Sequence, residues 1–218
     1  VVLERLGDAL HLELVARVAD RFRNVDRDDQ GRVHHGGRVS PGPCRNGLPS
    51  GRVARAWRLR VPAGNVRFED AIQGPVVEEV SQAVGDFVLL RADGLFAYQL
   101  AVVVDDAAAG VTHVVRGADL LDSTARQIVL QRCMGLPPVH YAHLPVVVNA
   151  TGEKLSKQTL ARAVEEGDPA SALFAALVFL GQGPPAELSG TPPSEVLAWG
   201  VAHWRLERVP RQRAAPAA

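Results

Sequence analysis

The chain has 218 residues, of which 47% are hydrophobic, and its 24 Lys and Arg balance 24 Asp and Glu to a formal net charge of zero. This length supports one sizeable core with room for a small satellite domain, and the zero net charge argues against a small, uniformly basic nucleic-acid module, although a local basic face is possible. No run reaches the roughly 18 apolar residues of a membrane span, no signal-peptide pattern opens the chain, and two cysteines are too few for a disulfide framework. We therefore expect a cytoplasmic protein with no membrane association.

The first third of the chain changes character twice. Residues 1–23 carry apolar side chains at steps of three and four, which predicts a helix. Residues 24–52 are rich in Asp, Arg, Gly, Pro and His with almost no apolar side chain, so we expect a long exposed excursion. Residues 56–61 and 65–68 alternate apolar and polar side chains around a Pro-Ala-Gly turn, which predicts a hairpin.

The middle third alternates strand and helix patterns. Residues 86–91 predict a strand and residues 95–106 a mostly apolar buried segment. A strand at 112–116, a helix at 119–134 and a strand at 144–148 follow, an order that predicts an α/β domain with a largely parallel sheet. Ligands of such sheets bind beyond the carboxyl ends of the strands, so the ends of the last two strands are candidate functional positions.

The last third is predicted to be helical. Residues 169–180 form one expected helix, which Gly181 ends, and Ser194 can cap a second helix that runs towards Trp204. The chain after Pro210 has the composition of a frayed tail.

A polar, Gly-containing loop at residues 149–158 follows the last predicted strand and places Lys154 and Lys157 on either side of Ser156. Two lysines three positions apart can both meet a polyphosphate and stabilise charge on a leaving pyrophosphate, and a serine hydroxyl adds a hydrogen bond. On spacing alone, an ordinary solvated loop is the other interpretation.

The same loop, K-L-S-K-Q at residues 154–158, resembles the K-M-S-K-S loop of class I aminoacyl-tRNA synthetases. The stretches around it resemble the glutamyl branch of that class almost continuously: residues 93–106, 110–120 and 126–127. Within the branch the chain is most similar to the glutamyl-Q tRNA(Asp) synthetases, short paralogues without an anticodon-binding domain. This similarity also extends to F-L-G-Q at residues 179–182 and W-R-L at residues 204–206.

The resemblance implies an α/β fold: a Rossmann-like class I catalytic domain with an inserted subdomain and a helical C-terminal part. The family's first strand and helix, which bear a substrate-binding arginine and an H-I-G-H type motif, have no counterpart in this sequence. We therefore expect the N-terminal half of the catalytic domain to be missing and the chain to be incomplete for catalysis. The expected parts are a catalytic-domain helix at 1–23, the loop-rich insertion with its hairpin at 24–85, the second catalytic half at 86–160, a helical part at 161–210 and a disordered tail at 211–218.

The resemblance also implies roles for individual side chains. Tyr98 and Arg116 correspond to residues that hold the substrate glutamate, and we expect them on one cleft wall. Arginine meets a carboxylate with a planar fork that lysine cannot reproduce. Lys154, Ser156 and Lys157 correspond to the loop that acts on ATP.

The residues themselves leave other interpretations open for these positions. Tyr98 could be a core aromatic with a satisfied hydroxyl. Arg116 could be a structural ion-pair partner of Asp119, and Asp119, near the start of a helix, could be a cap.

The family also has a structural zinc site made by Cys-x-Cys and Tyr-x-x-x-Cys, and only Cys44 matches one of its ligands here. The other positions of the pattern carry residues that are not its usual ligands: Ser40, Asp26 and Asp28. The neighbouring His34 and His35 could not easily both face one tetrahedral ion, although one could join Cys44. We expect that the zinc site is lost, and that Cys133 belongs to the core.

The resemblance thus implies a monomeric ligase that uses ATP with Mg²⁺, activates glutamate and transfers it to the queuosine of tRNA(Asp). Two alternatives remain at this point. The chain could be a fragment of a glutamyl-tRNA synthetase, which charges the tRNA 3′ end, or a non-catalytic remnant that binds RNA or a partner chain.

Overall fold

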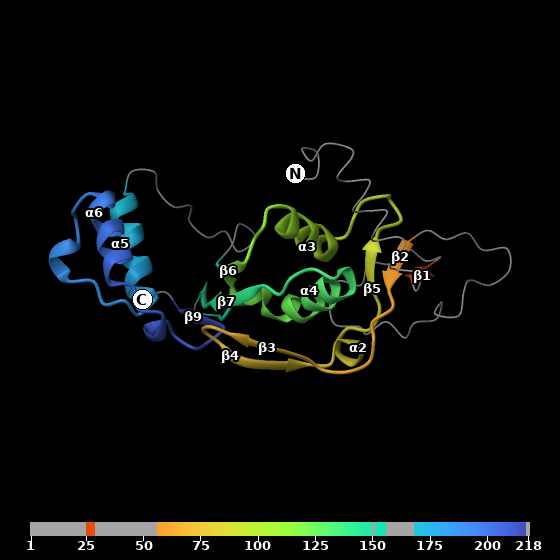
Figure 1. The fold of residues 1–218 in the computed structure, drawn as a ribbon. Helices are drawn as coiled ribbons and strands as arrows, with labels where there is room; N and C mark the ends of the chain where they lie inside the picture. The colour runs from red at the N-terminus through yellow and green to blue at the C-terminus, as the bar shows by residue number, and fades with distance from the viewer. Residues whose placement is uncertain (1–24, 29–55, 150, 156–167, 217–218) are drawn as a thin grey trace. The chain divides into compact units, whose positions relative to one another are not determined.

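A computed structural model describes residues 25–28, 56–149, 151–155 and 168–216 of the chain (Figure 1). The described residues form two compact units. Unit 1 contains those within 1–68, 76–112 and 122–139, and unit 2 those within 69–75, 113–121 and 140–218. The predicted helix at 1–23 and most of the predicted excursion lie outside the described residues.

Unit 1 contains an antiparallel sheet with the strand order β1-β2-β5. Its strands are β1 (Val25–Asp28), β2 (Ala56–Leu59) and β5 (Phe87–Leu90). The strand expected within 86–91 is therefore confirmed, whereas β1 lies inside the segment expected to be a loop. The backbone hydrogen bonds of β1 are made to the neighbouring strand β2 and do not need apolar side chains. The polar sequence of β1 therefore gave no sign of a strand.

Unit 1 also contains the helices α2 (Val80–Ala83), α3 (Tyr98–Ala108) and most of α4 (Leu121–Met134), and α3 contacts β5. The helix expected at 119–134 is confirmed as α4, preceded by the short 3-10 helix η1 (Ala118–Leu120). The apolar segment expected at 95–106 is largely helix α3, with three buried side chains. Among the buried apolar residues of the sheet and these helices are Ala56, Val80, Val103, Ala125 and Leu130.

A second sheet has the strand order β4-β3-β7-β6. Its strands are β3 (Val66–Asp70), β4 (Gly74–Glu78), β6 (His113–Gly117) and β7 (His140–Leu144). β6 and β7 are parallel over their whole length, and β3 pairs parallel to β7 through Asp70 and Tyr141. The predicted parallel sheet and the predicted strand at 112–116 are confirmed.

The hairpin expected between residues 56–61 and 65–68 is wrong, because β2 and β3 belong to different sheets. The chain after β2 is held in unit 1 by Asp86, whose carboxylate accepts the backbone N–H of Val61 at 2.9 Å. β3 instead neighbours β4, and the carboxylate of Asp70 accepts the backbone N–H groups of Ile72 and Gln73 in the turn that joins them. Alternation predicts a strand but does not choose its partner.

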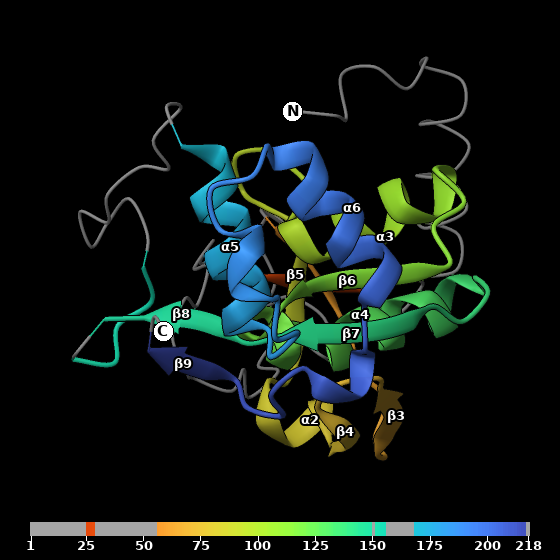
Figure 2. The same ribbon diagram turned by 90° about the vertical axis from the view of Figure 1, so that its left-hand side faces the viewer.

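The strand expected at 144–148 is divided by Pro145 into the end of β7 and the separate β8 (Val146–Val148). The parallel partner of β6 is β7, whereas β8 pairs parallel to β9 (Ala214–Pro216), as Figure 2 shows. The tail expected to be frayed after Pro210 therefore contributes a strand. Backbone pairing orders this segment, although its sequence has little apolar surface to bury.

The C-terminal helices are α5 (Pro169–Phe179) and α6 (Pro193–His203), which pack side by side (Figures 1 and 2). Short 3-10 helices follow each of them, η3 (Ala186–Leu188) and η4 (Leu206–Arg208). Gly181 ends α5 at φ +71°, and a Cβ there would collide with the carbonyl oxygen of Arg208. Ser194 is not the expected cap, because α6 begins one residue earlier with Pro192 at the N-cap position.

Gln182 connects the turn after α5 to the segment after α6. Its fully buried side chain accepts the backbone N–H of Arg205 at 2.8 Å and donates to the carbonyl oxygens of Leu180 and Arg205. These bonds join the two C-terminal stretches that carry the family resemblance.

Replacing Gln182 with Leu leaves these backbone groups without their partner, so we expect the free energy of unfolding to fall by about 1–3 kcal/mol. Urea denaturation measures this change. The same substitution at the exposed Gln82 is the control, with an expected change within about 0.5 kcal/mol. Equal effects at the two positions would contradict the role of Gln182.

Candidate active site

Arg116 is the second-to-last residue of β6, where the parallel strands of unit 2 end. Its Nε donates a hydrogen bond to Nε2 of His143 at 3.0 Å, and an Nη donates to the carbonyl oxygen of Leu120 at 3.4 Å. The guanidinium carbon lies 5.6 Å from the centroid of the Tyr141 ring, within cation–π range. The predicted strand thus ends at a guanidinium that three neighbours orient.

His143 connects Arg116 to a buried carboxylate. Its Nδ1 lies 2.6 Å from Oδ2 of Asp70, and its backbone N–H donates to Oδ1 of Asp70 at 3.1 Å. The side chains of both residues are fully buried. Gln73, in the turn after β3, donates its side-chain amide to the carbonyl oxygen of His143 at 2.8 Å.

The protonation states of this pair follow from its donors and acceptors. Burial acts to raise the pKa of Asp70, but hydrogen bonds from Gln73, His143 and Ile72 lower it overall, so Asp70 is an anion. An anion accepts, so His143 carries its proton on Nδ1. Since Arg116 can only donate, Nε2 is the acceptor. Burial lowers the pKa of His143 below its usual 6.5 despite the opposing effect of Asp70, which keeps the imidazole neutral.

The loop after β8 is built around the side chain of Asn149. Its Oδ1 accepts from the backbone N–H and hydroxyl of Thr151, at 3.0 and 2.7 Å, and from the backbone N–H of Glu153 at 2.8 Å. The backbone N–H of Leu155 donates to the carbonyl oxygen of Val147, which returns the chain alongside β8. This arrangement fixes the backbone on either side of Lys154.

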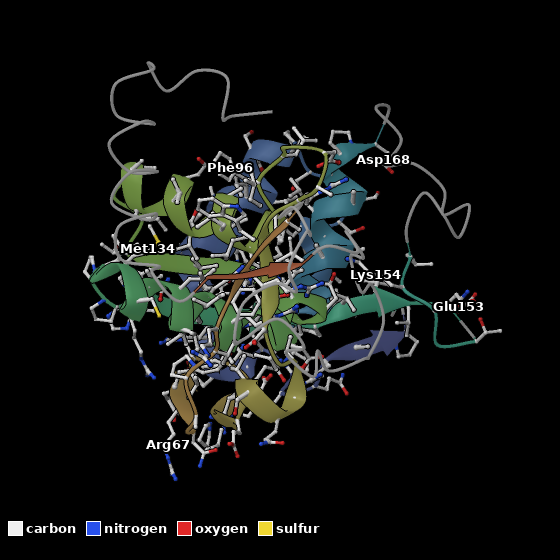
Figure 3. The ribbon with its side chains drawn as sticks, turned by 90° about the vertical axis from the view of Figure 1, so that its right-hand side faces the viewer. Arg67, Phe96, Met134, Glu153, Lys154 and Asp168 are labelled. Atoms are coloured by element: carbon white, nitrogen blue, oxygen red, sulfur yellow. The ribbon has the colours of Figure 1, made fainter. Side chains whose placement is uncertain are left out.

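Lys154 meets the segment that follows β6. Its Nζ lies 2.6 Å from Oδ2 of Asp119, in an ion pair that is partly exposed to solvent. Figure 3 labels Lys154 and its neighbour Glu153 on this loop. Gly117 makes room for the pair, because a Cβ at this position would collide with the carboxylate of Asp119. Asp119 therefore forms an ion pair with Lys154 and is not the cap considered from the sequence, because Gly117 occupies the N-cap position of η1.

Tyr98 is the first residue of α3 in unit 1, and 55% of it is exposed, so the interpretation as a core aromatic is wrong. The next residue, Gln99, is held by Ser123 and Gln127 of α4 through side-chain hydrogen bonds of 3.0 Å each. Tyr98 and Arg116 belong to different units. Their shared cleft wall therefore stays a prediction.

Several expected site residues lie outside the described residues: Ser156, Lys157, Cys44, His34 and His35. Among residues 56–149, 151–155 and 168–216, no three His, Cys, Asp or Glu side chains gather as metal ligands. The fate of the zinc site therefore stays a prediction.

Cys133 is half-buried, and burial raises the pKa of its thiol. Within the same described ranges, no helix is long and apolar enough to span a membrane.

Comparison with known proteins identifies the family of this chain. Residues 50–191 match the family "tRNA synthetases class I (E and Q), catalytic domain". The chain belongs to this family. A glutamyl-Q tRNA(Asp) synthetase of Aromatoleum aromaticum is 60% identical over 189 residues, which cover 87% of this chain and 60% of the relative. A second glutamyl-Q tRNA(Asp) synthetase, from Thiobacillus denitrificans, is 54% identical over residues that cover 82% of this chain and 60% of the relative. The chain thus spans about 60% of the length of these class I synthetases.

Solved structures show the same class I fold. A glutamate tRNA ligase from Elizabethkingia meningosepticum, in complex with its amino acid, has a TM-score of 0.57 and 22% identity over 75% of this chain and 36% of its own. A glutamate-tRNA synthetase from Elizabethkingia anophelis has a TM-score of 0.65 and 20% identity, and the match covers 94% of this chain and 51% of that structure's chain. The expected α/β class I catalytic domain is confirmed.

Sequence reasoning missed Asp70, His143 and Asn149. The signal for His143 was present, because it lies two residues after Tyr141, and alternate positions of a strand share one face. A polar ring on a buried face needs hydrogen-bond partners. The partner itself, 73 residues away, has no local signature.

The neutral His143 predicts a pH-dependent stability. Unfolded chains take up a proton at this histidine below about pH 6.5, whereas the folded protein resists until a lower pH. The free energy of unfolding should therefore fall as the pH drops from 7 to 5, by at most about 1.4 kcal/mol per pH unit from this group.

Urea denaturation at several pH values measures this loss. His143→Gln, which cannot titrate, should be less stable at pH 7 but lose less stability between pH 7 and 5. The comparison isolates the effect of His143, because every other residue is the same in the two proteins. Parallel curves for the two proteins would contradict a depressed pKa.

Proposed function

We propose that this chain carries part of the active site of a glutamyl-Q tRNA(Asp) synthetase, a ligase that joins glutamate to the queuosine of tRNA(Asp). In the first step a carboxylate oxygen of glutamate attacks the α-phosphorus of ATP. The bond to the bridging oxygen breaks, pyrophosphate leaves, and glutamyl-adenylate forms. In the second step the glutamyl group passes to the tRNA and AMP leaves.

One observation carries the proposal. The bond between Lys154 and Asp119 brings the lysine loop to a residue that lies three positions after Arg116 in the chain. A group that binds phosphate and a group that binds carboxylate thus lie on connected segments of one unit. The identity of 60% and 54% to relatives named glutamyl-Q tRNA(Asp) synthetase supports glutamate as the carboxylate.

The composition of the chain singles out the same loop. Lys154 and Lys157 are the only two lysines in the sequence, whereas there are 22 arginines. An ammonium group on a flexible stem is a compact charge that can follow a moving phosphate, whereas a guanidinium binds in a fixed plane. The lysine loop therefore has the chemistry for charge that develops on pyrophosphate as it leaves.

Each candidate residue has a role in this proposal. Arg116 binds a carboxylate of glutamate through its planar fork, and Tyr98 contributes a hydroxyl to the same substrate. Lys154, Lys157 and Ser156 bind the phosphates of ATP, whose Mg²⁺ supplies further positive charge. Catalysis then consists of positioning the reactants and stabilising the leaving group.

Pyrophosphate exchange tests the activation step. The protein assayed is a chimera in which the unmatched part of the Aromatoleum aromaticum relative completes this chain, with the 218-residue chain in parallel. We expect labelled pyrophosphate to enter ATP in the chimera only when glutamate is present. We expect no exchange by the 218-residue chain. The family's H-I-G-H type motif has no counterpart in it, and a nucleotide that is not held in position does not react.

In the active chimera, Lys157→Ala should slow glutamate-dependent exchange, because it removes one preorganised charge. The expected loss of transition-state stabilisation is about 2–4 kcal/mol. Arg67→Ala, which removes an exposed positive charge from β3, is the matched control and should leave exchange unchanged. Equal activity in the two variants would return the lysine loop to an ordinary solvated role. Transfer to tRNA(Asp) with queuosine, but not to the same tRNA without it, separates this function from charging of the tRNA 3′ end.

A further inference from the structure

The bonds from Asp70 through His143 to Arg116 form a continuous chain from a buried anion to the proposed substrate-binding cation. We propose that His143, held by Asp70, is a positioning residue that fixes the plane and the binding edge of the Arg116 guanidinium. The inference rests on the proposed function, in which Arg116 binds the carboxylate of an amino acid. Neither residue need touch the substrate.

The hydrogen count of Arg116 determines which edge meets a carboxylate. Nε of arginine carries one hydrogen, and this hydrogen is donated to Nε2 of His143 at 3.0 Å. A two-pronged bond to a carboxylate must therefore use the two Nη atoms and not the Nε edge. The Tyr141 ring, 5.6 Å from the guanidinium carbon, gives the planar group a second support.

Asp70 makes this arrangement specific to one tautomer. Its two oxygens accept from the backbone N–H groups of Ile72, Gln73 and His143 and from Nδ1 of His143. With that many donors in place, the carboxylate cannot turn away from the ring. The proton stays on Nδ1, which leaves Nε2 as an acceptor for Arg116.

The arrangement is sensitive to acid. The charged and titratable groups that bear on His143 are Asp70 from β3, Arg116 from β6 and Arg213 from the segment before β9, while Tyr141 stacks nearby on β7. Protonated His143 would present a second N–H to the donor of Arg116, and both groups would be positive. Acid therefore releases the guanidinium from its fixed plane.

Two substitutions of His143 separate its two bonds. Asn places its amide where Nδ1 lies and can still donate to Asp70, but it reaches no further. Gln extends to the position of Nε2 and offers Arg116 an acceptor oxygen. The matched control is His140→Asn, which replaces an exposed histidine on the same strand.

Nitrogen-15 NMR of the 218-residue chain tests the geometry without any activity. We expect the His143 proton on Nδ1 and a slowly exchanging Nε–H signal of Arg116. His143→Asn should lose this protection, and His143→Gln and His140→Asn should keep it. A proton on Nε2, or an Arg116 signal that is the same in His143→Asn, would overturn the inference.

Kinetics of the active chimera test the consequence for substrate. His143→Asn should raise the KM for glutamate about tenfold, the size of one lost hydrogen bond to a charged group, with the KM for ATP within about twofold. His143→Gln should restore most of the glutamate KM. In the wild type and in His140→Asn, but not in His143→Gln, the glutamate KM should rise as the pH falls below the pKa of His143.

The outcomes distinguish the inference from the proposed function. If Arg116→Lys leaves the glutamate KM unchanged, the assignment of Arg116 to glutamate fails, and the NMR result decides the positioning role by itself. If Arg116→Lys raises the KM but His143→Asn does not, the positioning role is overturned. If Asn and Gln are equally harmful and both KM values change together, His143 is only structural, and the inference is again overturned.

Discussion

The buried carboxylate of Asp70 holds together the part of unit 2 on which the candidate site depends. A buried anion is costly unless hydrogen bonds surround it, and here the backbone N–H groups of Ile72, Gln73 and His143 and the His143 ring all donate to it. These donors come from the turn after β3 and from β7. Their common acceptor fixes both segments, and through His143 it also orients Arg116 on β6.

The lysine loop is held by weaker and more local forces. Asn149 organises the start of the loop through bonds to Thr151 and Glu153, which lie within four positions, so this turn does not depend on distant contacts. The Lys154–Asp119 pair is partly exposed, and such pairs contribute about 0–1 kcal/mol to stability. A phosphate can therefore replace Asp119 as the partner of Lys154 at little cost. This difference agrees with the proposed roles, in which Arg116 holds glutamate and Lys154 meets the pyrophosphate that leaves.

Much of the local structure could be predicted from the sequence because it depends on neighbouring residues. Apolar periodicity predicted α4 and α5, and the conformation of Gly181 ended α5 as expected. The errors concern pairing. The strand β2 was assigned to a hairpin with β3, and β9 was expected to be a tail, because alternation and composition contain no information about which backbone lies alongside.

By itself, the sequence determined the strand that carries Arg116 near its end, the loop that follows β8 and carries Lys154, and the resemblance from which the family follows. Each of these is encoded in consecutive residues, where spacing and residue type suffice. Only the tertiary structure decided that Asp70 and His143, 73 residues apart, meet beneath Arg116. Parallel strands bring together residues from distant parts of a chain, and a buried polar side chain shows in the sequence that it needs a partner but not which residue the partner is.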